Sequence, residues 1–256
     1  MVLITTKSGK SGKLKVDFGA WVSVGNFTNN IDLLNIGLAY GSTGTPRDSI
    51  TTVWNGYITP LWNLSTPVSN VDYRHIDANG DGTINSLDTM AILQNYNLSY
   101  QRGGGSGTGL PLSLGIDSSY VLPHFSLPIL LGNASNPATG VYGGAFSILY
   151  DTTYIKPGSV FVTFDNSWLG TNNLDMISLS KNFWSDQQID VALTRINGMN
   201  IPGFGQLGKL NFTIKDDILQ RGFVLDSIVL DFHITNPIFI DADENVIDVS
   251  VNNTSW

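Results

Sequence analysis

The chain contains no cysteine and few charged residues. None of its 256 residues is Cys, and only 13% are Asp, Glu, Lys or Arg, about half of the ~25% that is typical of soluble domains. The missing thiols exclude disulfides, thiolate catalysis, iron–sulfur clusters and thiolate zinc sites. A secreted protein without disulfides needs another staple, and bound calcium is one that it can use.

Basic residues are scarcer than acidic ones. Lys and Arg number 13 against 21 Asp and Glu, which gives a net charge of −8 and an isoelectric point near 4.6. Binding to nucleic acid or to an acidic membrane surface needs clustered positive charge, so both are disfavoured. The run of Lys7, Lys10, Lys13 and Lys15 is interpreted as a solvated terminal strand.

Long apolar runs are also missing. No stretch approaches the ~18 residues that a membrane-spanning helix needs, and the opening Met1–Lys7 is too short for the core of a signal peptide. We therefore expect either a cytosolic chain or the mature region of an extracellular, cell-surface protein, and the calcium loop and resemblance described below favour the second. Hydrophobic residues at 42% are enough to build a core.

The composition changes at residues 103–109, Gly-Gly-Gly-Ser-Gly-Thr-Gly, which are typical of a flexible linker. Beyond this segment, short apolar stretches alternate with turn residues, which predicts a mainly β fold, a sandwich of antiparallel sheets. The predicted strands are Leu110–Ile116, Phe125–Leu131, Gly144–Tyr150, Val160–Phe164, Met176–Leu179, Ile189–Ile196, Lys209–Ile214, Ser227–Ile234 and Ile247–Val251.

Before the linker, two segments have apolar residues at helical spacing, Ile31–Gly41 and Leu87–Asn97. The first ends at a glycine, a common helix stop. Superimposed, they match in pairs, which indicates a duplicated loop-helix unit. The pairs are Asn29 with Asn85, Asp32 with Asp88, Ile36 with Ile92, and Tyr40 with Tyr96.

The second copy contains a calcium-loop pattern over Asp77–Asp88. Oxygen donors stand at loop positions 1, 3, 5, 9 and 12, and Gly82 stands at position 6, where the loop must turn. A hard cation such as Ca²⁺ takes about six to eight oxygens, whereas Mg²⁺ favours a stricter geometry. The alternative is an Asn/Asp/Gly-rich turn without metal. The predicted ligands of one Ca²⁺ are Asp77, Asn79, Asp81, the carbonyl of Thr83, Asn85 and Asp88.

The first copy has lost this pattern. Trp21, Ser23 and Gly25 stand at positions 1, 3 and 5, and only Asn29 and Asp32 remain as donors at positions 9 and 12. We therefore expect one calcium ion and not two.

A third acidic cluster, Asp241–Asn245, imitates the start of such a loop. Val246 then occupies the place of the glycine, and Asn252 that of the closing carboxylate. A turn between the last strands is the favoured interpretation.

The duplicated loop-helix unit with Asp at position 12 resembles a dockerin over residues 20–102. Its long spacer is more similar to dockerin-like segments of secreted surface proteins from Bacteroidota-type bacteria. Residues 110–256 resemble a cohesin, the partner of dockerins, through Phe146–Asp151, Gly208–Phe212 and Asn236–Asp241. The resemblance implies a non-catalytic binding module with a jelly-roll or immunoglobulin-like sandwich. It also implies a division into an N-terminal arm (1–19), a dockerin-like unit (20–102), a linker (103–109) and a cohesin-like sandwich (110–256).

If both resemblances hold, the halves either dock within one chain or link successive chains head to tail. Head-to-tail contacts that do not close grow into filaments, and self-assembly is the preferred prediction. Strands predicted at Leu14–Phe18 and Val246–Val251 could each complete a neighbour's sheet. The partner is thus another copy or a cohesin- or dockerin-type protein.

An enzyme is not expected. The histidines His75, His124 and His233 lie in unrelated contexts, and no pair of carboxylates stands out. The alternative function is a carbohydrate-binding or scaffold module of a larger secreted hydrolase, with Trp168 and Trp184 as candidate glycan platforms.

Glycosylation is a further prediction. Asn63 and Asn133 fit the N-glycan acceptor pattern. Ser49 and Ser227 fit the Asp-Ser-aliphatic pattern that the Bacteroidota resemblance implies for O-glycans.

Overall fold

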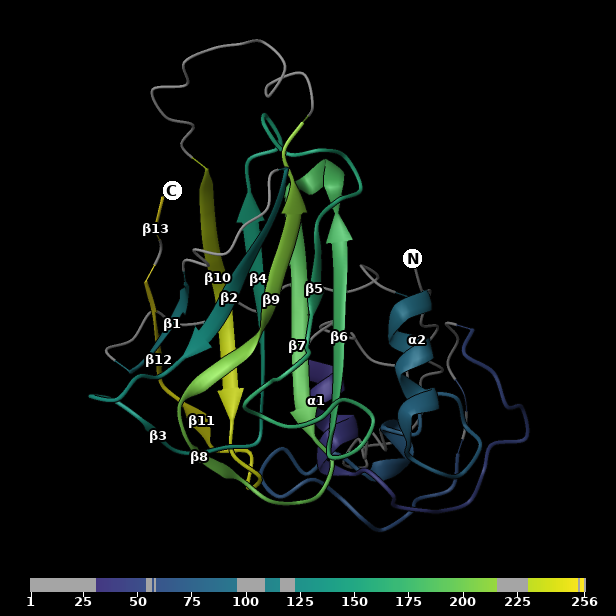
Figure 1. Cartoon of the computed structure of the whole chain (residues 1–256). Helices are drawn as coiled ribbons and strands as arrows, with labels where there is room; N and C mark the ends of the chain where they lie inside the picture. Colours follow the sequence, from purple (N-terminus) through teal and green to yellow (C-terminus); the bar gives the residue numbers. More distant parts are fainter. Residues whose placement is uncertain are drawn as a thin grey trace, which may run out of the picture.

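Strands dominate the computed structural model. They form two large sheets that stack face to face, and helices α1 (Ile31–Leu38) and α2 (Thr89–Gln94) lie beside one of them (Figure 1). None of the helices in the described part of the chain has the length and apolar run needed to cross a lipid bilayer. The structure describes residues 31–53, 57, 59–95, 109–115, 123–215, 230–252 and 254–255.

The other elements complete the sandwich and the loop-helix region. Short 3₁₀ helices are η1 (Tyr73–His75), η2 (Ser86–Asp88) and η3 (Trp184–Asp186). The strands are β1 (Leu110–Leu114), β2 (His124–Leu131), β3 (Ala138–Val141), β4 (Gly143–Tyr150), β5 (Phe161–Thr163), β6 (Met176–Phe183), β7 (Gln188–Arg195), β8 (Ile201–Gly203), β9 (Gly205–Thr213), β10 (Asp231–Ile240), β11 (Val246–Ile247), β12 (Val249–Asn252) and β13 (Thr254–Ser255).

The first sheet has the order β12-β1-β2-β9-β5, and the second has β11-β10-β4-β7-β6 with β13 also paired to β10. Strands β3 and β8 form a small separate ribbon. The mainly β sandwich predicted from the sequence is confirmed. Every predicted strand has an observed counterpart, although residues 227–229 of one lie outside the described residues. The prediction missed β3 and β8, which are short and contain Gly or Pro, and also the two-residue strand β13.

The prediction of a purely antiparallel sandwich was wrong at one pair. Strand β12 runs parallel to β1, with Leu110 opposite Val249. Strand β11 belongs to the second sheet, and only Asp248 separates it from β12 in the first. A single residue leaves no room for a reversing turn, so the chain changes sheets without changing direction and meets β1 in parallel.

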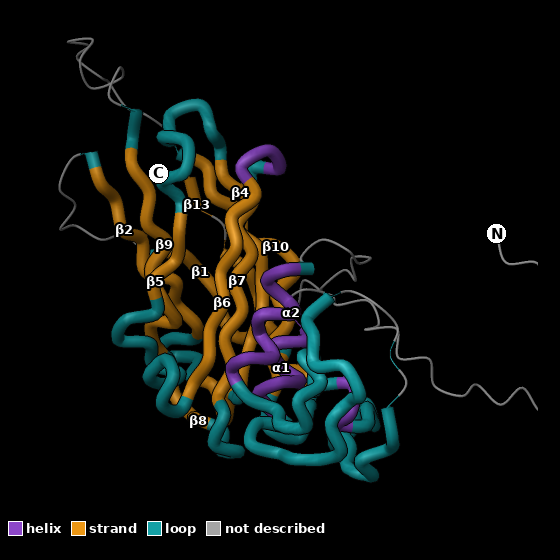
Figure 2. Tube along the Cα trace, turned by 90° about the vertical axis from the view of Figure 1, so that its right-hand side faces the viewer, coloured by secondary structure: helices purple, strands orange, loops and turns teal. Residues whose placement is uncertain are grey.

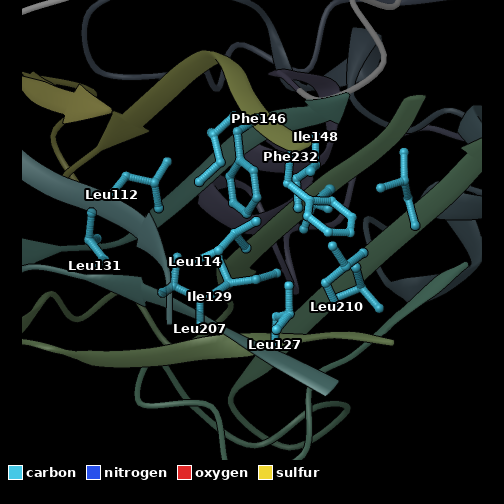
Figure 3. Packing of buried hydrophobic residues seen from close by; sticks show 14 of the residues in the cluster. Leu112, Leu114, Leu127, Ile129, Leu131, Phe146, Ile148, Leu207, Leu210 and Phe232 are labelled. Atoms are coloured by element: carbon cyan, nitrogen blue, oxygen red, sulfur yellow. The ribbon is translucent and has the colours of Figure 1, made fainter. Parts of the chain in front are cut away.

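The main core lies between the two sheets. Residues alternate along the strands, and inward-facing aliphatic and aromatic side chains interdigitate, as Phe146, Ile148 and Phe232 do with Leu112 and Ile129 (Figure 3). The rings of Phe146 and Phe239 stack at 6.2 Å between centroids. Burial of this apolar surface is the main driving force for folding.

A second core joins the loop-helix region to the outer face of the second sheet (Figure 2). Alternation sends Ile177, Leu179 and Ala192 away from the sandwich interior and towards the helices. Leu33 and Ile36 of α1 are 0% and 1% exposed against them. The loop-helix region and the sandwich therefore share one hydrophobic cluster, which also contains Ala39, Ile76, Ala78, Ile84, Ala91, Ile92 and Ala145.

Both predicted helices are present but shorter than expected. Helix α1 ends at Leu38, and Gly41 adopts φ +82°, a conformation that glycine reaches without strain. The second begins as η2 and continues as α2 to Gln94. The predicted arm 1–19, the strand Leu14–Phe18 and most of the linker lie outside the described residues, so the domain division stays a prediction.

Helix α1 approaches the sheet closely at a glycine. A Cβ on Gly37 would stand 2.3 Å from Thr194 Oγ1 and 2.7 Å from the carbonyl oxygen of Arg195. The carbonyl belongs to strand β7, which cannot move without breaking its ladder. A side chain at this position would therefore push the helix off the sheet.

We predict that Gly37→Ala destabilises the protein by about 1–3 kcal/mol, the usual cost of overpacking. Helix propensity alone would predict the opposite sign, because Ala is favoured over Gly by about 1 kcal/mol. Urea unfolding measures the difference, with Asn35→Ala in the same helix as the control. A stabilised Gly37→Ala variant would show that α1 does not pack on β7 as described.

Candidate calcium-binding loop

Residues Asp77–Asp88 form a closed loop between η1 and α2. Two glycines adopt left-handed backbone conformations, Gly80 at φ +79° and Gly82 at φ +86°. Asp77 Oδ1 accepts a hydrogen bond from the Gly80 N–H at 2.8 Å, and its Oδ2 accepts one from the Gly82 N–H at 3.0 Å. The first side chain of the pattern thus folds back into the loop, where it is 4% exposed.

Asp88 closes the loop from its other end. Its Oδ1 accepts from the Asn79 N–H at 3.1 Å, and its Oδ2 accepts from the Asn85 N–H at 2.8 Å. The second bond is half of a capping box, since the Asn85 side chain caps η2 in return. Asp88 is completely buried.

The donors between these ends also turn towards the loop backbone. Asn79 Oδ1 accepts from the Asp81 N–H at 2.8 Å, and Asp81 Oδ1 accepts from the Thr83 N–H at 2.8 Å. Asn85 Oδ1 accepts from the Leu87 N–H at 2.7 Å, and its amide donates to the Thr83 carbonyl at 3.4 Å. Every predicted ligand therefore belongs to one hydrogen-bonded loop.

Burial makes the loop carboxylates costly as anions. The pKa of Asp88 is raised to about 7, mainly by desolvation and in smaller part by the neighbouring Asp77 charge, against the backbone hydrogen bonds that lower it. Burial likewise raises the pKa of Asp77. A buried anion is unfavourable unless a cation compensates it, so these residues fit a hard cation.

Carboxylates alone would not complete such a site. Among the described residues, no three Asp, Glu or His side chains gather closely enough to hold a metal ion. The amide oxygens of Asn79 and Asn85 and the Thr83 carbonyl would have to supply further ligands. Mixed donors of this kind suit Ca²⁺, which accepts carbonyl, amide and water oxygens.

A segment that the sequence analysis missed wraps the loop. Gly44 N–H donates to the Gly82 carbonyl at 3.0 Å, and Arg47 N–H donates to the Gly80 carbonyl at 2.9 Å. The Arg47 side chain is 8% exposed, and its Nη2 donates to the Ala78 carbonyl at 2.8 Å. Nothing in the local sequence signals this contact, because its partners are 31 residues apart.

The first copy of the loop is described only at its end. Asp32 lies in the first turn of α1, and burial raises its pKa well above the ordinary value. Its Oδ2 has no hydrogen-bond partner among the described residues. The other residues considered for this copy, Trp21, Ser23, Gly25 and Asn29, lie outside them.

The third acidic cluster is a turn, as predicted. Asp241 accepts hydrogen bonds from the Asp243 N–H at 2.9 Å and the Asn245 N–H at 2.8 Å, between β10 and β11. The Glu244 carboxylate accepts two hydrogen bonds from Ser69 in the loop-helix region. The Ser69 N–H donates one at 2.9 Å, and the Ser69 hydroxyl donates the other at 2.7 Å. The cluster therefore ties the sandwich to the loop-helix region.

The remaining candidates lie apart from the loop. Trp168 and Trp184, the candidate glycan platforms, are partly buried and pack against the main core. Ser49, Asn63 and Asn133 are exposed, and Ser227 lies outside the described residues. Their glycosylation stays a prediction.

Comparison with known proteins gave structural neighbours only. No family model and no curated protein matches the chain. One similar structure is the sixth cohesin of scaffoldin B from Acetivibrio cellulolyticus, solved with a mutant dockerin. It is 22% identical, covers 58% of this chain and 97% of its own, and has a TM-score of 0.43.

Two further neighbours are also cohesin modules. One comes from a family 33 glycoside hydrolase of Clostridium perfringens, with 14% identity, 58% of this chain and 96% of its own covered, and a TM-score of 0.41. The other is the second type II cohesin of the ScaA scaffoldin from Acetivibrio cellulolyticus, with 12% identity, 58% and 96% covered, and a TM-score of 0.42. Likeness at this level does not carry an argument about function.

We predict that, in chelator, the free energy of unfolding falls as the pH rises from about 4 to about 7. The pKa of Asp88 is about 7 in the folded chain and about 3.9 in an unfolded one. The folded state therefore binds the proton more tightly in this window, and its advantage disappears as the pH passes the folded pKa.

Urea unfolding in EDTA across this window measures the slope. Asp88→Asn removes the titrating group and should flatten the slope, whereas Asp165→Asn, an exposed residue of the sandwich, should leave it unchanged. Equal slopes in Asp88→Asn and the parent would contradict the burial of Asp88.

Proposed function

We propose that the protein is a non-catalytic, calcium-stabilised structural module of the cell surface, in which the loop-helix region is docked on the sandwich of its own chain. The observation that carries this proposal is the shared core between the candidate loop and the outer face of the second sheet.

The apolar residues of the loop connect it to that core. Ala78 and Ile84 stand at loop positions 2 and 8 and are 6% and 0% exposed. They belong to the same cluster as Ile92 of α2 and as Ile177 and Leu179 of β6. A cation that fixes the loop backbone would therefore also fix the residues that pack on the sheet.

Polar contacts reinforce the docking. Tyr142 donates its hydroxyl to the Gly37 carbonyl at 3.0 Å and accepts from the Gly198 N–H at 3.3 Å. Lys181 of β6 donates to the Leu93 carbonyl of α2 at 3.0 Å. These bonds attach both helices to the sandwich, and directional contacts of this kind favour one orientation over others.

Docking within the chain is preferred here to the head-to-tail assembly favoured by the sequence. The outer faces of β6 and β7 that would receive another chain's helices are already covered by α1. Head-to-tail assembly remains the second candidate, because the Gly-rich residues 103–109 have the composition of a hinge that would allow the loop-helix regions to exchange between chains.

A glycan platform at Trp168 or Trp184 is not favoured, because both side chains pack against the main core. An extracellular location is part of the proposal. The candidate calcium loop supports it, because bound calcium can take the place of disulfides as a staple in a secreted protein.

We expect CaCl₂ to slow amide hydrogen exchange in residues 77–94 and also along β6 and β7. The second effect follows from the shared core, because a stiffer loop opens less often from the sheet. Asp77→Ala should abolish both effects, and Asp165→Ala should keep them. Protection confined to the loop would contradict the coupling, and no protection at all would contradict calcium binding.

Light scattering of the intact chain in calcium tests the docking mode. Docking within the chain predicts a monomer of 27.8 kDa at all concentrations. A mass that grows with concentration, and that Gly37→Ala alters, would instead support exchange of the loop-helix region between chains.

A further inference from the structure

Arg47 places a buried positive charge behind the candidate calcium loop. Its backbone N–H donates to the Gly80 carbonyl, and its Nη2 donates to the carbonyls of Ala78 at 2.8 Å and Thr51 at 3.0 Å. The guanidinium carbon lies 4.4 Å from the centroid of the Tyr57 ring. Carbonyls and an aromatic face therefore hold this cation in a fixed position.

The backbone of the loop makes room for this side chain. A Cβ on Gly80 would stand 1.8 Å from Arg47 Nε, so any side chain there would expel the guanidinium. Nε itself is buried and has no hydrogen-bond partner among the described residues. Burying this N–H without a hydrogen-bond partner is unfavourable for the folded state. The negative charge of the loop can offset that cost through its attraction to the guanidinium.

That compensation comes from the predicted ligands. Burial lowers the pKa of Arg47, and the negative charges of Asp77 and Asp88 oppose this shift. The side-chain hydrogen bonds of Arg47 go to backbone carbonyls. The carboxylates of Asp77 and Asp88 accept their hydrogen bonds from backbone N–H groups of the loop. The arginine thus acts on them through its field.

We infer that Arg47 is a positioning residue whose fixed charge lowers the cation affinity of the loop and favours divalent over trivalent ions. The inference rests on the proposed calcium binding. With Asp77, Asp81 and Asp88 ionised, three carboxylates against one guanidinium leave a net charge of −2, which one Ca²⁺ neutralises. Repulsion by a fixed charge grows with the charge of the incoming ion, so it penalises a trivalent ion more.

The test titrates the intact protein with CaCl₂ and TbCl₃ by calorimetry. Removing the charge in Arg47→Met should tighten Ca²⁺ binding by about fivefold and Tb³⁺ binding by about tenfold, because the effect scales with ion charge. The ratio of the two constants is the decisive readout. A loss of loop shape alone would weaken both ions together, whereas a loss of charge changes the ratio.

Three other variants control the experiment. Arg47→Gln also removes the charge but keeps a donor, and should shift the ratio in the same direction. Arg47→Lys keeps the charge and should leave the ratio unchanged. Arg74→Met removes another partly buried arginine just before the loop, one that donates to the Thr59 carbonyl at 2.8 Å, and should also leave the ratio unchanged.

The outcomes separate the inference from the proposed function. An unchanged ratio in Arg47→Met and Arg47→Gln, with calcium still bound, would overturn the inference and leave the proposed function standing. Failure of both variants to fold even in saturating calcium would likewise overturn it, because Arg47 would then be a structural strut. A parent protein that binds neither ion would overturn both.

Discussion

The apolar contact between helix α1 and the outer face of β4, β7 and β6 governs the arrangement of the molecule. A sheet in a sandwich can leave its second face to water, and polar residues then alternate with the core residues. Here Ala145, Ile177, Leu179 and Ala192 make that face apolar instead. Exposed together they would be an aggregation hazard, and α1 removes them from water.

This contact links the chemistry of the loop to the mechanics of the sandwich. The same twelve-residue loop presents carboxylates and amides on one side and the apolar side chains of Ala78 and Ile84 on the other. Its polar side has a charge imbalance that a cation would relieve. Its apolar side cannot rearrange without disturbing the shared core. The charge balance of the loop and the packing of the shared core are thus coupled, because the residues of both kinds are neighbours along the same short stretch of backbone.

Much of this could be predicted from local patterns. Short apolar stretches bounded by turn residues identified the strands of the sandwich, because both signals lie within a few positions of each strand. Gly82 and the oxygen donors from Asp77 to Asp88 identified the loop, because its turn is set by residues that are close together in the sequence. The short strands β3 and β8 were not predicted, because the Gly and Pro residues that they contain are typical of turns and not of strands.

The sequence by itself determined the mainly β sandwich, the helix pattern and the set of oxygen donors in the loop, because each of these is encoded by residues within about a dozen positions of one another. Only the tertiary structure decided that the helices cover the chain's own sheet, that β12 joins β1 in parallel and that Arg47 lies behind the loop. Such pairings join residues that are distant along the chain. They depend on which surfaces complement one another once the whole chain is packed, and no local pattern records that.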